Sequence, residues 1–227
     1  MDSHEHDEAV ATPPQPLRDC ELCPRLVQFR HDNRQRYASY FNAPVPSFGA
    51  VSAPLLVVGL APGLKGANRT GRPFTGDYAG DLLYATLLEF GFARGIYKAS
   101  PDDGLDLHEC RLTNAVRCVP PENRPNGAEV RTCGQFLRSE VAAMSNLRMI
   151  VALGQVAHRA VVTVFGGRQA VFPFSHGGRH RLPNGVMLTD SYHCSRYNTN
   201  TGRLTTDMFR DVFRSVRRMI DQGDWAE

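Results

Sequence analysis

The stretch PLLVVGLAPG, residues 54–63, decides the fold class. Its apolar part, Leu55–Gly59, has the composition of a strand buried on both faces, and the glycine- and proline-rich residues after it form a turn. Three more apolar runs with strand character follow at 112–116, 149–153 and 186–189. These runs predict a sheet of four strands.

Segments with the apolar spacing of helices separate these strands. The predicted helices cover residues 79–90, 127–144, 155–165 and 205–220. Because strands and helices alternate, we predict an α/β fold in which helices cover both faces of a mostly parallel sheet. The stretches rich in Gly and Pro are predicted loops, at 41–54, 99–109, 119–127 and 166–185.

The charge distribution separates a short N-terminal tail from a single domain. Residues 1–16 hold four acidic residues and no Lys or Arg, and we predict a disordered acidic tail there, followed by one domain over 17–227. Net charge is +3 for the chain, and leaving out the tail gives 26 basic against 19 acidic residues, or +7. This excess is compatible with a polyanionic partner.

No sequence segment indicates export or insertion into a membrane. The longest apolar runs are far shorter than the ~20 residues that span a bilayer, and the N-terminus lacks the basic start and apolar core of a signal peptide. We therefore expect a cytoplasmic protein that does not contact membranes.

Six cysteines raise the question of a metal centre. Cys20 and Cys23 form a C-x2-C pair, and Cys118 and Cys133 flank a loop and a helix start. Four thiolates suit either tetrahedral zinc or a [4Fe–4S] cluster, and buried inert cysteines are the alternative. The other two cysteines are weaker candidates for metal ligands. Cys110 should pack in the core, and Cys194 could only line a pocket.

The glycine-rich loop 59–77 matches neither common phosphate-binding pattern. Walker loops need Lys followed by Ser or Thr after the second glycine, and Arg72–Pro73 stand there in this chain. The dinucleotide pattern fails because no glycine stands two positions after Gly59. Phe74 and Asp77 close the loop, and a ring beside a carboxylate is more typical of a base pocket than of a phosphate cradle.

Four motifs stand at the predicted strand ends, where parallel sheets bind ligands. They are GLAPG (59–63), GRPFTGD (71–77), LTNAVRC (112–118) and HCSRYN (193–198). Together they resemble the uracil-DNA glycosylase superfamily, more narrowly its family five, the iron–sulfur-containing type B enzymes of bacteria and archaea. The resemblance runs from about Cys20 to about Arg218.

The resemblance implies a three-layer αβα fold around a four-stranded parallel sheet. It also implies an enzyme that hydrolyses the N-glycosidic bond of uracil in DNA and leaves an abasic site. A [4Fe–4S] cluster is implied on Cys20, Cys23, Cys118 and Cys133, with a structural role. The resemblance, and not the spacing, favours iron–sulfur over zinc.

The resemblance also assigns roles in a pocket for a flipped base, which such an enzyme needs. Phe74 is the expected stacking ring, and Asn114 the reader of the base edge, since an amide both donates and accepts. His193 is expected to donate a hydrogen bond to the departing base. Gly59 and Ala61 are expected to contact the base. As alternatives, Phe74 could be ordinary core and Asn114 structural.

The first motif departs from much of the superfamily. Leu60 and Ala61 occupy the place where Asp, Asn or Glu is common, so Asp77 is the candidate that stabilises the sugar cation and orients water. A helix N-cap is the alternative role for Asp77, and both roles could coexist. Because the usual acid is absent, we expect the enzyme to accept other deaminated bases as substrates, including hypoxanthine and xanthine. Cys194 stands where proline is common.

The segment after His193 is a predicted loop and the expected contact with DNA, either double- or single-stranded. Ser195, Arg196, Tyr197 and Asn198 are its candidates for phosphate contact and for wedging into the duplex. An ordinary polar loop is the alternative.

The lysine content bears on whether the enzyme could also act as a lyase. The chain has only two lysines, Lys65 and Lys98, and neither lies in the motifs, so a Schiff-base lyase activity is not expected. We predict a monomeric, monofunctional glycosylase. The alternatives are a nucleotide phosphohydrolase that uses Asp77 with magnesium, and a non-catalytic iron–sulfur module that binds DNA.

Overall fold

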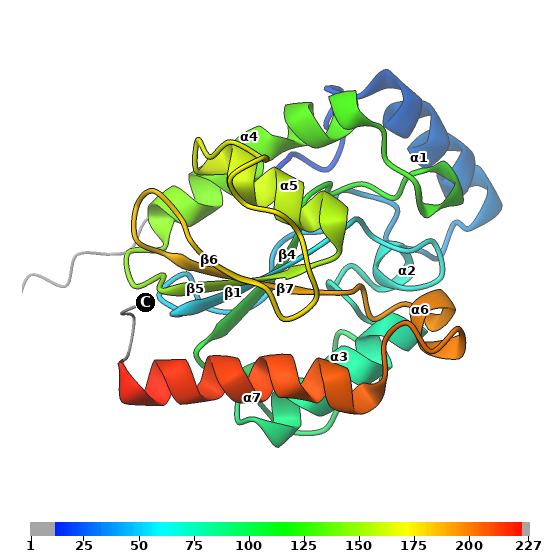
Figure 1. Cartoon of the computed structure of the whole chain (residues 1–227). Helices are drawn as coiled ribbons and strands as arrows, with labels where there is room; N and C mark the ends of the chain where they lie inside the picture. Colours follow the sequence, from blue (N-terminus) through cyan, green and yellow to red (C-terminus); the bar gives the residue numbers. More distant parts are fainter. Residues whose placement is uncertain (1–11, 224–227) are drawn as a thin grey trace, which may run out of the picture.

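A five-stranded sheet runs through the middle of the protein in the order β4-β1-β5-β7-β6 (Figure 1). The structure is a computed structural model and describes residues 12–223. Its strands are β1 (Leu55–Gly59), β4 (Cys110–Asn114), β5 (Met149–Leu153), β6 (Arg179–Arg181) and β7 (Met187–Ser191). The four predicted strands pair in parallel as expected.

The strand β6 adds an antiparallel edge that the sequence did not predict. It lies inside the segment 166–185, where we expected only loop. Its three residues, RHR, carry no apolar side chain, and both arginines are exposed. An edge strand that buries no apolar side chain gives no periodic signal, so the sheet is mixed and not purely parallel.

The four predicted helices are present, with bounds within two residues of those expected. They are α3 (Tyr78–Glu89), α4 (Gly127–Ala143), α5 (Gln155–Val164) and α7 (Thr206–Gln222). The remaining elements are α1 (Pro24–Arg36), α2 (Ala67–Thr70), α6 (Arg196–Asn200), the 3-10 turn η1 (Pro121–Asn123) and the hairpin of β2 (Ala93–Arg94) and β3 (Asp106–Leu107).

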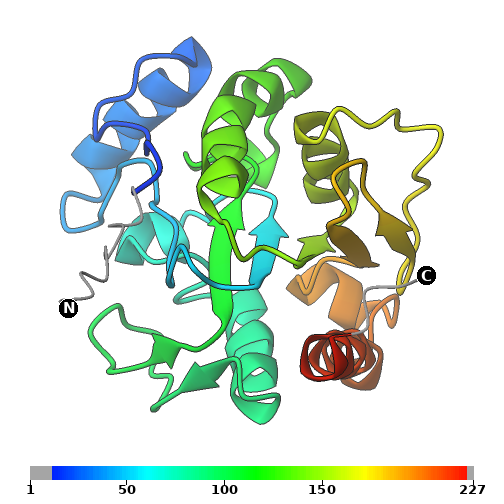
Figure 2. The same ribbon diagram turned by 90° about the vertical axis from the view of Figure 1, so that its left-hand side faces the viewer.

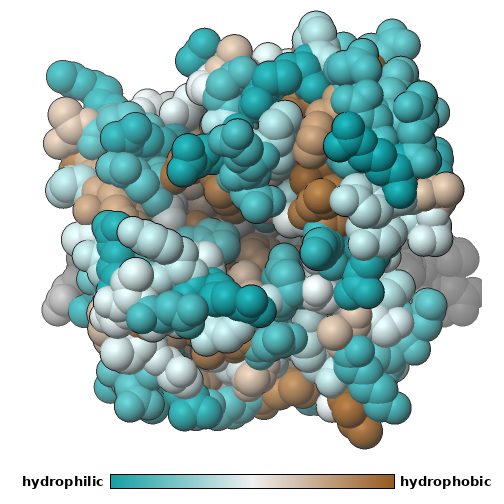
Figure 3. Space-filling view, turned by 90° about the vertical axis from the view of Figure 1, so that its right-hand side faces the viewer, coloured by the Kyte–Doolittle hydropathy of each residue, from teal (hydrophilic) through white to brown (hydrophobic). Residues whose placement is uncertain are grey.

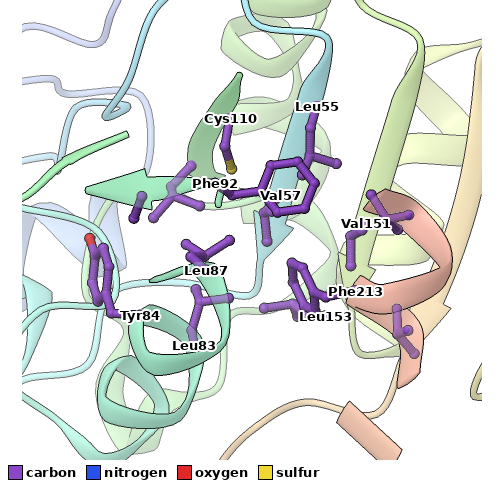
Figure 4. Packing of buried hydrophobic residues seen from close by; sticks show 14 of the residues in the cluster. Leu55, Val57, Leu83, Tyr84, Leu87, Phe92, Cys110, Val151, Leu153 and Phe213 are labelled. Carbon is purple, nitrogen blue, oxygen red and sulfur yellow. The ribbon is translucent and has the colours of Figure 1, made fainter. Parts of the chain in front are cut away.

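Helices cover both faces of the sheet, which confirms the three-layer prediction. α4 and α5 lie on one face and α3 and α7 on the other (Figures 1 and 2). Successive strand residues point to opposite faces, so Leu55 and Val57 join the apolar cluster under α3 and α7, whereas Leu56 and Val58 join that under α4 and α5. Figure 4 shows Cys110 inside the first cluster, as the sequence predicted.

The helix α1 was not predicted, because its buried stripe is mostly polar. Leu26, Arg30 and Asn33 are its buried residues, at the spacing of one helix face. Arg30 donates from Nη2 to the carbonyl of Cys20 at 3.0 Å. The hydrogen-bonded guanidinium replaces the apolar side chains that a periodicity search detects.

Part of the predicted tail packs against the domain. Residues 1–11 lie outside the described residues, so the expectation of disorder there is not addressed. Pro13 is buried, and Gln15 accepts a hydrogen bond from Arg117 at 3.1 Å. Pro16 lines the pocket that holds the four candidate cysteines. The ordered part of the domain therefore begins before residue 17.

No helix within residues 12–223 has the length and apolar character required to cross a bilayer.

Candidate active site

A cleft of about 800 Å³ opens at the carboxyl ends of the parallel strands. Figure 3 looks onto this side of the molecule and shows the hollow near its centre, with hydrophobic atoms at its base and hydrophilic atoms around it. Segments that follow all four parallel strands line the cleft. The carboxyl ends of the four predicted strands therefore converge on one cavity.

Asp77 lines the cleft and also caps α3. Its carboxylate accepts a hydrogen bond from the backbone N–H of Gly80 at 3.2 Å. A side chain at Gly63 or Gly66 would collide with Asp77 Oδ2, so these glycines let the loop close around the carboxylate. Burial raises the pKa of Asp77 against the opposing effect of backbone N–H groups. The capping role and the place in the cleft coexist.

His193 lines the same cleft from the segment after β7. Burial lowers the pKa of its imidazole to about 4, so the ring is neutral near pH 7 and can donate an N–H without carrying charge. Gly154, at the end of β5, has φ of 94° and lies against the His193 side chain. The backbone carbonyl of His193 accepts a hydrogen bond from the Asn198 amide at 2.8 Å.

Gly59, Phe74 and Asn114 meet at the ends of β1 and β4. Gly59 pairs with Asn114 in the sheet register, and a side chain at Gly59 would collide with the Phe74 ring and the Asn114 amide. Phe74 and Asn114 are only 6% and 3% exposed. They do not line the open cleft, whereas Leu60 and Ala61, which follow Gly59 in the chain, do.

The start of α6 forms one wall of the cleft, in a segment that we predicted as a loop. Ser195, Arg196 and Tyr197 line the cleft, and Tyr197 is 73% exposed. Ser195 accepts from the Asn198 N–H at 3.4 Å, and so caps α6. Asn198 does not line this cleft, and its amide supports His193 instead. Ser195, Arg196 and Tyr197 therefore share the cleft with Asp77 and His193.

The opposite wall contains residues that sequence reasoning missed. Glu122, Asn123 and Arg124 line the cleft from the turn after β4. Glu122 and Asn123 both have positive φ, 54° and 56°. The stretch PPENRPNG marks a turn but carries no chemical motif, so only its position in space gives it a function. Lys65 also lines the cleft.

The four candidate cysteines line a second pocket, between the start of α1, the turn after β4 and the start of α4. Cys133 Sγ accepts the backbone N–H of Arg117 at 3.3 Å. Arg30 Nη1 lies 3.9 Å from Cys118 Sγ. Burial raises the pKa of Cys23 to about 11 and that of Cys118 to about 12, and neighbouring cysteines add to both shifts.

One group of potential metal ligands contains no cysteine. Within residues 12–223, His158, His180 and Asp190 place three potential ligand atoms within 4.8 Å of one another. His158 is already bonded, to Asp190 and to the Phe172 carbonyl, each at 2.8 Å.

Cys194 does not line the cleft, which corrects the expectation for this residue. Its side chain is 0% exposed and belongs to the apolar cluster under α3 and α7. Its thiol lies 3.5 Å from the Ala79 carbonyl. The backbone after β7 places His193 toward the cleft and its neighbour toward the core.

A three-layer αβα fold whose strand ends carry a half-buried carboxylate and a neutral imidazole in one cleft defines the class of the protein. The model of the uracil DNA glycosylase superfamily matches residues 46–217, and the chain belongs to this superfamily. Within it, the chain belongs to the type-5 enzymes, as its relatives show.

Three type-5 uracil-DNA glycosylases illustrate the similarity. The relative from Thermus thermophilus is 45% identical, over 90% of this chain and 95% of its own length. That from Pyrobaculum aerophilum is 43% identical over 91% of both chains. That from Mycobacterium leprae is 43% identical over 88% of this chain and 91% of its own length. The resemblance noted from the four motifs is confirmed.

Proposed function

We propose that this protein excises uracil from DNA by hydrolysing the N-glycosidic bond and leaving an abasic site. The observation that carries this proposal is the meeting of Asp77 and His193 in one cleft at the strand ends of a uracil-DNA glycosylase fold. The bond to a base inside a duplex is out of reach, so the base must first be flipped into the cleft.

The two residues then act on opposite charges. Positive charge develops on the sugar as the bond breaks, and the Asp77 carboxylate stabilises it and orients the attacking water. Negative charge develops on the departing base, and the neutral His193 donates a hydrogen bond to it. Asn114 and Phe74, which meet beside Gly59 at the strand ends, are proposed to read the base edge and to stack on the base.

Other deaminated bases are proposed as further substrates. Leu60 and Ala61 line the cleft and offer it no acidic side chain. The motif GLAPG supplies no side-chain carboxylate or amide, so hydrolysis depends on Asp77. Few side chains then discriminate between one deaminated base and another. Oligonucleotides with one uracil, hypoxanthine or xanthine are expected to break after enzyme and alkali, and one with thymine to stay intact. Intact strands with all three damaged bases would overturn the proposed function.

The rival functions make different predictions for the same assay. A magnesium-dependent phosphohydrolase would use Asp77, with waters and substrate phosphates, to hold the metal. Glycosylase activity should survive a chelator that abolishes magnesium-dependent turnover. A module that only binds DNA should behave the same after Asp77 and His193 are changed.

We propose that Cys20, Cys23, Cys118 and Cys133 hold a [4Fe–4S] cluster. The four thiols come from separate segments of the chain and line one pocket. The N–H of Arg117 and the guanidinium of Arg30 point hydrogen bonds at two of the sulfurs, as is usual for cluster ligands. When bound, the cluster would tie the N-terminal segment to the turn after β4.

Metal content tests this assignment directly. Purified protein is expected to be brown and to carry about four iron atoms per chain. Cys118→Ser should lose most of the iron and part of the thermal stability, because the ligands come from separate segments. Cys194→Ala, in the apolar core, is the control and should keep its iron. Zinc in place of iron, or full iron in Cys118→Ser, would contradict the assignment.

The partner and the place of action follow from the same function. The candidate partner is DNA that contains deaminated bases, approached with the basic residues Lys65, Arg124 and Arg196 around the cleft. We propose that the protein acts as a monomer, since every group used in the mechanism comes from one chain. We propose the cytoplasm as its place of action.

A further inference from the structure

The backbone at Phe74 is in an unusual conformation. Its φ is 54°, in the left-handed region that bulky residues seldom adopt. The turn that follows carries the chain to Asp77, so the same backbone places both the ring beside Gly59 and the carboxylate in the cleft. Such a conformation persists only where surrounding groups hold it.

The hydroxyl of Tyr97 spans this turn. It accepts a hydrogen bond from the backbone N–H of Gly76 at 3.3 Å and donates one to the carbonyl of Phe74 at 3.4 Å. Burial raises the pKa of Tyr97 to about 12, so the hydroxyl keeps its proton. The Tyr97 ring is stacked on Tyr84, with centroids 4.5 Å apart.

A buried ion pair, between Arg72 and Asp103, fixes the same turn. Arg72 donates to the two carboxylate oxygens of Asp103 at 2.8 and 2.9 Å. The backbone N–H groups of Lys98 and Leu105 also donate to Asp103, at 2.9 and 3.1 Å. Arg72 Nε donates to the hydroxyl of Thr75, the residue after Phe74, at 2.8 Å.

We infer that Tyr97 and Asp103 are positioning residues for base excision, which hold the Phe74–Asp77 turn from the segment 97–105. Neither residue lines the cleft. Both lie in or beside a stretch, 99–109, in which the sequence shows only loop. The inference rests on the proposed function and adds to it the groups that keep the reacting side chains in place.

Tyr97→Phe gives the sharpest test, because it removes one oxygen and keeps the stacked ring. Single-turnover excision of uracil is expected to slow about 10-fold, because a small misplacement of reacting groups is costly. The Kd for the same DNA, measured by fluorescence anisotropy, should change less than about twofold, because the turn acts on the chemical step. Asp103→Asn should show the same split between rate and affinity.

Two controls separate positioning from stability. Tyr40→Phe removes a hydroxyl from another stacked tyrosine pair, with Tyr37 at 4.9 Å, and should react like the wild type. Val161→Ala opens a small cavity on the opposite face of the sheet and should lower Tm without slowing excision. The double variant of Tyr97 and Asp103 should slow excision less than the product of the single effects, since both hold one turn.

The outcomes distinguish this inference from the function itself. A Tyr97→Phe rate equal to that of the wild type, or an equal loss in Val161→Ala, would overturn the positioning role. Parallel losses of rate and DNA affinity would overturn it as well. Wild-type protein in the same assay reports the proposed function independently.

Discussion

Replacing Asp77 by Asn is expected to slow uracil excision about 10²–10³-fold while DNA affinity stays nearly constant. The substitution removes the negative charge that stabilises the sugar cation. The Asn side-chain oxygen can still accept the N–H of Gly80 and cap α3, so the fold should persist. Single-turnover rates on an oligonucleotide with one uracil, with Kd measured in parallel, give the two quantities.

The pH dependence of the same variant provides a second measurement. Asp77 must be ionised to act, and burial raises its pKa, so the wild-type rate should fall as the pH drops through this raised value. His193 has its pKa lowered to about 4, so a fall in rate well above pH 4 should come from Asp77 and not from His193. In Asp77→Asn the acid limb should therefore disappear.

Asp81→Asn is the matched control for Asp77. Asp81 lies in the first turn of α3 and its pKa is also raised, mainly by burial and partly by Asp77. It does not line the cleft. Excision by Asp81→Asn should stay near the wild-type rate. If Asp77→Asn were as active as Asp81→Asn, Asp77 would be only a helix cap.

His193→Ala is expected to slow excision by a similar factor, about 10²–10³-fold, because it removes the donor aimed at the departing base. The effect should appear in the single-turnover rate with uracil. The wild-type rate should depend little on His193 between pH 6 and 8, since its low pKa keeps the ring neutral. His31→Gln changes an exposed histidine on α1 and serves as control.

A small loss of single-turnover rate in His193→Ala would contradict this role. It would mean that another group donates the hydrogen bond to the departing base. Asn198→Ala adds a graded test. Its amide holds the His193 carbonyl at 2.8 Å, so a smaller loss of rate is expected there than in His193→Ala. A greater loss in Asn198→Ala would indicate that Asn198 itself contacts DNA.

Local periodicity was sufficient to predict the main helices and the parallel strands. The prediction for 127–144 found α4 because its apolar residues repeat on one helical face. It failed for α1 and β6, whose packing side chains are polar or exposed. The segment 195–198 was expected to be a loop, but it contains the N-cap and the start of α6. The five residues of α6 bury no side chain, so they give no periodic signal.

The candidate site was predictable only where chemistry and strand ends coincide. Asp77 and His193 stand in motifs directly beside strands or helix starts, and both line the cleft. Glu122 and Arg124 stand in a turn without such a motif, so their place in the cleft was not predictable. Cysteine spacing left zinc and iron–sulfur open, and the structure adds that the four thiols line one pocket.

The sequence by itself determined the αβα layers and the order of the motifs, because side chains repeat every 2 residues in a strand and every ~3.6 in a helix. Only the tertiary structure decided which groups support the site. Tyr97 bonds to Phe74, which lies 23 positions away in the sequence, and Arg117 bonds to Gln15, which lies 102 positions away. No local pattern encodes such contacts, because they depend on how separate segments pack around the sheet.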